Sequence, residues 1–162
     1  MPLRLKRLLM IFAPLLLLPI LALAILSATA RRPSNLGVTA GKLLPCPASP
    51  NAVSTQSDSP EHRIEPLTFT GEPAVAWKRL RAALATLPRV NVITERDDYL
   101  YAEVTSRLFR FVDDVEFVLD SESKQIHFRS ASRVGHSDMG ANRARMEAVR
   151  TEFERLAADG AT

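Results

Sequence analysis

Recognisable catalytic motifs are scarce in this chain of 162 residues, and its one cysteine is Cys46. It has no Gly-x-Ser-x-Gly elbow and no glycine loop that would cradle a phosphate. His136, Ser137 and Asp138 are consecutive, so their side chains cannot form a relay with one another. A lone cysteine without a placed base is weak evidence for a nucleophile. We therefore expect a binding or scaffolding module without catalytic residues; the alternative is a hydrolase or thiol-dependent enzyme that uses Cys46 or Asp113.

An excess of positive charge is also missing once the amino terminus is set aside. The 21 Lys and Arg exceed the 18 Asp and Glu by three, and Arg4, Lys6 and Arg7 account for this difference. The rest of the chain is formally neutral, whereas a nucleic-acid-binding domain needs a basic face to neutralise phosphates. We expect no nucleic-acid partner. No metal and no cofactor are expected either, because the histidines and carboxylates follow no recognised ligand spacing.

Charged residues are absent from residues 8–26, which form one apolar run. Its length approaches that needed to cross a bilayer and exceeds a usual signal-peptide core, which favours a retained anchor. The alternative is a signal peptide cleaved after Ala30, because residues 28–30 form a small-x-small site. Three basic residues precede the run and two, Arg31 and Arg32, follow it, which places the amino terminus inside. We expect a single-pass inner-membrane protein with its domain in the periplasm, or a periplasmic protein if the site is cut.

Three motifs identify relatives of the chain. They are Leu44-Pro45-Cys46-Pro47 with the following Pro50-Asn51-x-Val53-Ser54, the strand-like Phe111-x-Asp113-Asp114-Val115-Glu116-Phe117, and the polar stretch 129–143. Over residues 43–157 the chain resembles the domain of unknown function 1499 family, found in bacterial envelope proteins and plastid relatives. The resemblance implies no established activity. The family usually carries a second cysteine after the Pro-Asn pair, and this chain has Ala52 there, which argues against a disulfide or a two-thiol metal site.

Composition and periodicity divide the chain into three parts. Residues 1–30 are the signal anchor or signal peptide, 31–63 an extended Pro- and Ser-rich tether that leads into an irregular segment, and 64–159 a globular domain. The globular part is expected to contain a strand at 64–69, a helix from about Pro73 to before Pro88, strands at 90–95, 99–105, 108–119 and 125–134, and a helix at 138–157. We expect an α+β domain, an antiparallel sheet of about five strands with two helices on one face, which resembles a reduced helix-grip fold.

Asp113 is the one charged residue on the apolar face of the strand at 108–119. The register expected for its hairpin pairs Leu119 with Ile126, Glu116 with Arg129 and Asp113 with Ser132. Residues 95–122 carry a net charge of −6 and residues 124–150 a net charge of +4, so we expect Asp113 or Asp114 to pair with Arg129 or Arg133. The predicted structural network consists of Asp113, Asp114, Glu116, Ser132, Asp138 and Asn142.

The stretch 129–143 also supports a functional interpretation. Arg129 and Arg133 share a strand face and the last helix opens near Ser137, so free backbone N–H groups lie beside guanidinium groups. The predicted site for an anion or ligand consists of Arg129, Arg133, His136, Ser137 and Arg143. The alternative is structural, with Ser137 or Asp138 capping the helix and the arginines pairing with the preceding acids. The expected partners are the membrane, through residues 8–26, and a small anionic or amphipathic ligand or an envelope protein; Cys46 is the candidate reactive thiol.

Overall fold

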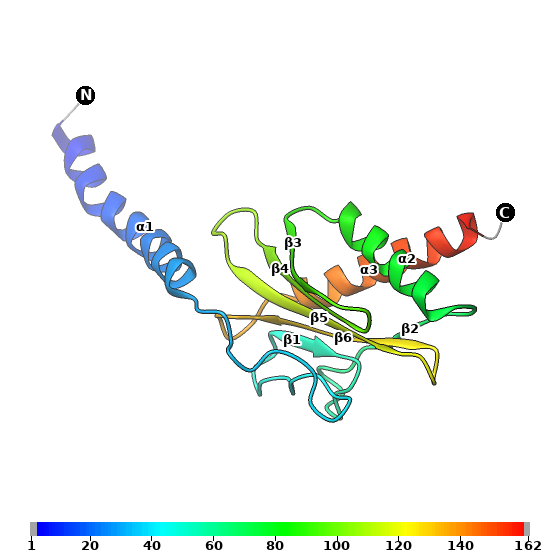
Figure 1. The fold of residues 1–162 in the computed structure, drawn as a ribbon. Helices are drawn as coiled ribbons and strands as arrows, with labels where there is room; N and C mark the ends of the chain where they lie inside the picture. Colours follow the sequence, from blue (N-terminus) through cyan, green and yellow to red (C-terminus); the bar gives the residue numbers. More distant parts are fainter. Residues whose placement is uncertain (1–2, 161–162) are drawn as a thin grey trace.

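The computed structural model describes residues 3–160, with the side chains of residue 15 and of residues 17–160. Over this range the chain is an α+β protein with one six-stranded sheet and three helices, so the expected class is confirmed (Figure 1). The elements are, in order, α1 (Leu3–Thr29), β1 (Ala52–Ser54), β2 (Leu67–Thr68), α2 (Pro73–Thr86), β3 (Val90–Glu95), β4 (Tyr99–Thr105), β5 (Val112–Asp120), β6 (Gln125–Ser132) and α3 (Ala141–Asp159).

All pairings within the sheet are antiparallel, as expected. The strand order is β1-β6-β5-β4-β3, and β2 pairs with the opposite end of β6 from β1. The β5–β6 hairpin pairs Leu119 with Ile126, Glu116 with Arg129 and Asp113 with Ser132. The register expected from the sequence is therefore confirmed.

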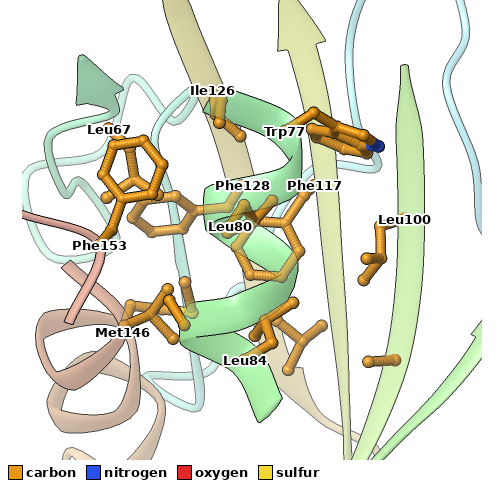
Figure 2. Packing of buried hydrophobic residues seen from close by; sticks show 14 of the residues in the cluster. Leu67, Trp77, Leu80, Leu84, Leu100, Phe117, Ile126, Phe128, Met146 and Phe153 are labelled. Carbon is orange, nitrogen blue, oxygen red and sulfur yellow. The ribbon is translucent and has the colours of Figure 1, made fainter. Parts of the chain in front are cut away.

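Helices α2 and α3 lie on the same face of the sheet and form the main core with it (Figure 1). Pro73 opens α2 in its first turn, where a missing N–H is tolerated, and the helix ends before Pro88. Figure 2 shows the α2 residues Trp77, Leu80 and Leu84 packed over Phe117 and Phe128 of the sheet, all at most 5 % exposed. Burial of a leucine or phenylalanine side chain to this degree contributes about 1.5–3 kcal/mol.

The first two strands differ from the expectation. The sheet has six strands rather than five, because Ala52–Ser54 forms β1 beside β6. A strand of three residues is too short for alternation to be recognised in a Pro- and Ser-rich segment. The strand expected at 64–69 is reduced to Leu67–Thr68, because only these two residues pair with β6.

Strand β5 and helix α3 also begin later than expected. The strand expected from residue 108 begins at Val112, because residues 106–111 fold back into a loop closed by backbone hydrogen bonding. The last helix begins at Ala141 rather than at residue 138. Asp138 precedes it and accepts a hydrogen bond from the backbone N–H of Asn142 at 2.8 Å. Asp138 therefore satisfies an N–H of the first turn, as the structural interpretation of this residue expected.

The other face of the sheet is covered by residues 32–63, which carry no helix (Figure 1). Leu43 from this segment is buried in a second, smaller apolar cluster with Tyr99, Tyr101 and Val118. The segment that composition predicted to be an extended tether leading into an irregular stretch thus packs on the sheet. We call this side of the sheet the loop face and the side under α2 and α3 the helix face.

Helix α1 projects away from the sheet and is joined to the domain through residues 30–35 (Figure 1). No helix within the described residues is both long enough and apolar enough to cross a membrane. The predicted anchor at residues 8–26 includes residues 8–14 and 16, whose side chains lie outside the described part of the chain. The anchor therefore stays a prediction.

Candidate functional site

Side-chain alternation along β4, β5 and β6 sorts the buried polar residues onto the two faces of the sheet. The helix-face cluster consists of Asp113, Ser130, Ser132, Asn142 and Arg145. The loop-face cluster consists of Tyr99, Tyr101, Glu103, Asp114, Glu116, Arg129 and Arg133. The two clusters lie back to back on the same strands, so their local chemistry can be compared directly.

Asn142 is the centre of the helix-face cluster and is fully buried. Its amide nitrogen donates to the backbone oxygen of Asn51 at 3.0 Å and to Ser132 Oγ at 3.1 Å. Its amide oxygen accepts from Arg145 Nη1 at 2.6 Å and from the hydroxyl of Ser130. Arg145 also pairs with the carboxylate of Asp113. This cluster joins α3, β5, β6 and the residue before β1, and each of its polar side chains has a hydrogen-bond partner.

The outer part of the loop-face cluster is an ion-pair network around Arg133. Its Nη2 lies 2.7 Å from Asp114 Oδ1, and it also pairs with Glu103, which accepts from Arg32 Nε at 2.8 Å. Burial opposes the charge of Glu103, but the hydrogen bonds from Arg133, Arg32 and Tyr101 hold its pKa below the ordinary value. Burial also lowers the pKa of Arg133, while Asp114 and Glu103 more than compensate and raise it. In this outer network, hydrogen bonds and ion pairs to opposite charges outweigh the effect of burial on each charged group.

The inner part of the loop-face cluster is the pair Glu116 and Arg129, at 0 % and 6 % exposure. Glu116 Oε1 accepts from the Tyr99 hydroxyl at 2.8 Å and from the Gly37 N–H at 2.7 Å. Its Oε2 lies 3.6 Å from Arg129 Nη1, too far for a hydrogen bond. Among the described residues, Glu116 Oε2 and Arg129 Nε are the two buried side-chain atoms without a hydrogen-bond partner.

Burial raises the pKa of Glu116, although Tyr99, Gly37 and the charge of Arg129 act in the opposite direction. Burial and the bond to Glu116 also raise the pKa of Tyr99. The environment of the Glu116 carboxylate thus disfavours its negative charge. Its Oε1 accepts two hydrogen bonds, whereas its Oε2 accepts none. A buried polar atom without a partner costs about 1–3 kcal/mol, so this arrangement carries a stability cost that the helix-face cluster lacks.

Two pockets lie along the segment 32–63. One, of about 520 Å³, is lined by Cys46, His62 and residues 42–48 and 54–61. Burial raises the pKa of the Cys46 thiol, while the positive charge of Arg129 opposes this rise. Neither Arg129 nor Glu116 is among the residues that line this pocket.

The second pocket, of about 370 Å³, is lined by residues 32–39, by part of β3 and by Arg96, Tyr99 and Tyr101. Its two arginines lie over tyrosine rings, Arg32 at 5.6 Å from the centroid of Tyr101 and Arg96 at 5.8 Å from that of Tyr99. These stacks fix one guanidinium group beside Tyr99, which donates to Glu116, and the other beside Tyr101, which donates to Asp114 and Glu103.

Of the five residues predicted to bind an anion, Arg129 and Arg133 share one cluster and the other three lie apart from it. Arg129 and Arg133 lie in the loop-face cluster and pair with carboxylates. Arg143 donates to the backbone oxygens of Glu61 and Arg63. Ser137 Oγ accepts from the backbone N–H of Met139 at 3.2 Å, and His136 is exposed.

The predicted pairing of the acidic hairpin with the basic segment is present in part. Asp114 pairs with Arg133, whereas Asp113 pairs with Arg145 from α3 rather than with a strand arginine. The difference has a simple cause, because Asp113 and Asp114 point to opposite faces of β5. Within the described residues, no three His, Cys, Asp or Glu side chains are grouped as metal ligands.

Sequence reasoning missed several members of both clusters. Tyr99, Tyr101 and Glu103 alternate along β4 with the buried Leu100 and Ala102, and this alternation marks them as one face. The remaining missed members are Ser130 and Arg145, and the missed residues that bond to the clusters from outside are Asn51, Gly37 and Arg32. Arg145 lies three residues after Asn142 on α3, a spacing that indicates contact. No local pattern indicates Gly37 or Arg32, because both reach the site through the path of the covering segment.

Comparison with known proteins gives one match. The model of a family described as "Protein of unknown function (DUF1499)" matches residues 42–153, which include the whole sheet and most of α3. Comparison with curated proteins gave no match, and comparison with solved structures gave none either.

Proposed function

This chain belongs to the DUF1499 family, and we propose that it is a membrane-tethered extracytoplasmic binding module without catalytic activity. Residues 8–26 hold it in the inner membrane with the domain in the periplasm. Its ligand is a small anionic or amphipathic molecule that enters between the covering segment and the loop face. An envelope protein that presents a carboxylate or phosphate group is the other partner with this chemistry.

One observation carries this proposal: Glu116 Oε2 and Arg129 Nε are buried side by side without hydrogen-bond partners. Buried polar groups in proteins are normally paired, and an exception requires a reason. An anionic oxygen that accepts from Arg129 Nε supplies the missing partner for the donor. A hydroxyl or amide on the same ligand donates to Glu116 Oε2. The pair thus matches a ligand with an acidic group and a neighbouring donor.

The pocket of about 520 Å³ supports an amphipathic ligand. Leu43, Leu44, Pro45 and Pro47 line it together with Cys46, whereas Arg129 lies outside its lining. The proposal therefore places the apolar body of the ligand against residues 43–47 and requires its acidic head to pass the covering segment to reach Arg129. Pockets of 300–1,000 Å³ are typical of small-molecule sites.

The alternative enzyme would use Cys46 or Asp113, and the contacts of both residues argue against it. A nucleophilic cysteine needs a lowered pKa, whereas burial raises the pKa of Cys46. His62 lines the same pocket, but its Nδ1 lies 2.9 Å from the Ala52 backbone oxygen and the residue is 5 % exposed. Asp113 is engaged by Arg145 on the helix face. These contacts favour binding over catalysis.

Native mass spectrometry of the full chain purified in detergent tests the proposal. We expect a retained molecule that carries an acidic group and that is lost from Arg129→Gln. Arg155→Gln is the matched control, because Arg155 pairs with Glu152 on the exposed side of α3. It should keep the molecule.

Two results would contradict the proposal. One is a wild-type chain that carries no molecule while a crystal structure shows a single water bridging Glu116 and Arg129. The other is a molecule retained equally by Arg129→Gln.

A further inference from the structure

Outside α1, the two most exposed large apolar side chains among the described residues are Leu108 and Met139, at 79 % and 98 %. The others, Val38, Val75 and Val92, are smaller and between 40 % and 56 % exposed. Leu108 lies in the loop between β4 and β5, and Met139 in the connection from β6 to α3. Both loops leave the sheet at the same end, because β4 and β6 end where β5 begins. The two exposed apolar side chains therefore belong to loops at one end of the sheet.

The backbone holds both residues outward. The β4–β5 loop is closed by Ser106 N–H donating to the Phe111 backbone oxygen at 2.8 Å and by Phe111 N–H donating to Ser106 Oγ at 2.9 Å. Arg110 in this loop has φ +59°, and Met139 has φ +55°. Non-glycine residues rarely adopt this left-handed conformation, and they persist in it where the surrounding structure enforces it. The two tips are therefore fixed rather than random loop ends.

The charge around these tips is basic. Arg89, Arg107 and Arg110 are exposed at this end of the sheet. The one carboxylate in the two loops, Asp138, is held by the backbone N–H groups at the start of α3.

The turns at the opposite end of the sheet carry the exposed acids Asp97, Asp98 and Glu122 beside the exposed bases Arg96 and Lys124, so that end has no basic excess. A basic rim around apolar tips is the pattern that binds an anionic membrane surface.

Helix α1 leaves the domain on this same side. It ends at Thr29, and the side chain of Arg32 shortly after is bound to Glu103 near the end of β4. Arg133, the first residue after β6, is bound to the same Glu103. In Figure 1 the β4–β5 loop and the β6–α3 connection both turn at the side from which α1 departs. A bilayer that holds α1 would face this end of the sheet.

We propose that the loops 106–111 and 133–140 rest on the anionic surface of the bilayer, with Leu108 and Met139 inserted at the headgroup level and Arg107 and Arg110 against lipid phosphates. This inference rests on the membrane anchor of the proposed function. The contact orients the domain, so that the end of the sheet with these two loops lies on the membrane. The turns after β3 and β5, at the other end of the sheet, point away from it. It needs no residue of the loop-face cluster and is independent of the ligand.

The test places an environment-sensitive fluorophore on Leu108→Cys in the full chain with Cys46→Ser. The protein is reconstituted into vesicles of phosphatidylcholine with phosphatidylglycerol and nitroxide-labelled lipid. Val75→Cys on α2 is the matched control, because Val75 is also apolar and exposed (56 %). We expect quenching and a blue shift at position 108 and neither at position 75. With Arg107→Gln and Arg110→Gln together, the equilibrium constant for contact between the loops and the bilayer should fall roughly thirtyfold. Each basic residue near an anionic surface contributes about 1 kcal/mol to binding.

The outcomes separate this inference from the anchor. An unquenched label at position 108 on protein that resists alkaline carbonate extraction overturns the surface contact and leaves the anchor standing. Quenching at position 108 on protein that carbonate releases supports the contact and removes the anchor. Equal quenching at positions 75 and 108 shows that the fluorophore itself partitions into lipid, and it overturns the specific orientation.

Discussion

The helix face and the loop face of the central sheet each carry a buried polar cluster of similar composition. The two clusters differ in how completely their polar atoms are hydrogen-bonded. On the helix face, Asn142, Arg145 and Asp113 form a closed set in which each side chain is hydrogen-bonded. On the loop face, Glu116 and Arg129 are as deeply buried, yet each leaves an atom unpaired. A closed cluster specifies a fold, whereas an open one lowers stability and persists where a function requires it. The difference identifies the loop face as the place to look for a ligand.

The two faces also differ in how regular the segments that cover them are. The helix face is packed by two regular helices that exclude water from the core (Figure 2). The loop face is covered by residues 32–63, which contain β1 and otherwise irregular backbone, and which border both larger pockets. Irregular segments of this kind are held by fewer cooperative contacts and open locally more easily. Access to Glu116 and Arg129 is therefore expected through this segment.

The largest expected effect lies on the helix face. Arg145→Ala should lower the free energy of unfolding by about 3–5 kcal/mol, because it strands the buried carboxylate of Asp113 and removes a donor to Asn142. Asp113→Ala should be similarly destabilising, and the double variant should lose less than the sum. Urea unfolding measures all three.

The control for this cycle combines Asp113→Ala with Arg133→Ala, two residues on opposite faces. Their effects should add within about 0.3–0.5 kcal/mol. Two results would contradict the division into two clusters. One is a strong coupling energy between Asp113 and Arg133, and the other is additive losses of unfolding free energy for Asp113 and Arg145.

A smaller effect is expected from the titration of Glu116. Its pKa in the folded state is raised by burial, so the folded state binds this proton more tightly than the unfolded state. The resulting stabilisation is complete below about pH 4, the ordinary range of glutamate, and is lost as pH rises through the raised pKa. Glu116→Gln removes this dependence. The stability of the wild type relative to Glu116→Gln should therefore fall as pH rises, measured by urea unfolding at a series of pH values. A difference that stays constant would show that the pKa of Glu116 is the same in the folded and unfolded states and would contradict the effect of burial.

The smallest effect concerns Cys46. Because burial raises the pKa of its thiol, alkylation by iodoacetamide near pH 7 should be slower than for a free cysteine of pKa about 8.5. Arg129→Gln removes the opposing positive charge and should slow the reaction further. Mass spectrometry of the intact chain gives the rate. Faster alkylation than for free cysteine would restore the thiol-dependent enzyme as the better interpretation.

The sequence allowed prediction of the sheet from β3 to β6 because the chain alternates over most of it, although β3 shifts register against β4 between Val92 and Thr94. The period of two in β3 and β4 gave both strands at their observed bounds, and the pairing of Leu119 with Ile126 gave the register of the whole β5–β6 hairpin. The helices followed from apolar spacing and from Pro88. β1 was missed because three residues without period carry no local pattern, and its place is set by pairing with β6.

The site was predicted only where contacts are local in the hairpin. Glu116 opposite Arg129 follows from register alone, and it is the pair that the structure leaves unsatisfied. The contacts from Gly37 to Glu116 and from Arg32 to Glu103 depend on how residues 32–63 cross the sheet, which no periodicity encodes. Arg129 and Arg133 share the loop face, as strand alternation predicted, whereas Arg143 lies on α3 and donates to the backbone of residues 61 and 63, so the three arginines do not converge.

The most direct measurement of the central claim is the stability of two uncharged double variants of the ligand-free chain. Replacing the open pair, Glu116→Gln with Arg129→Met, should raise the free energy of unfolding, because it removes two poorly paired buried charges while an amide oxygen still accepts from Tyr99 and Gly37. Replacing the closed pair, Asp113→Asn with Arg145→Met, should lower it, because Ser130 and Asn142 lose a donor. Opposite signs are the result we predict. A loss of stability for both variants would contradict the account, because the loop-face pair would then be a structural ion pair like its counterpart.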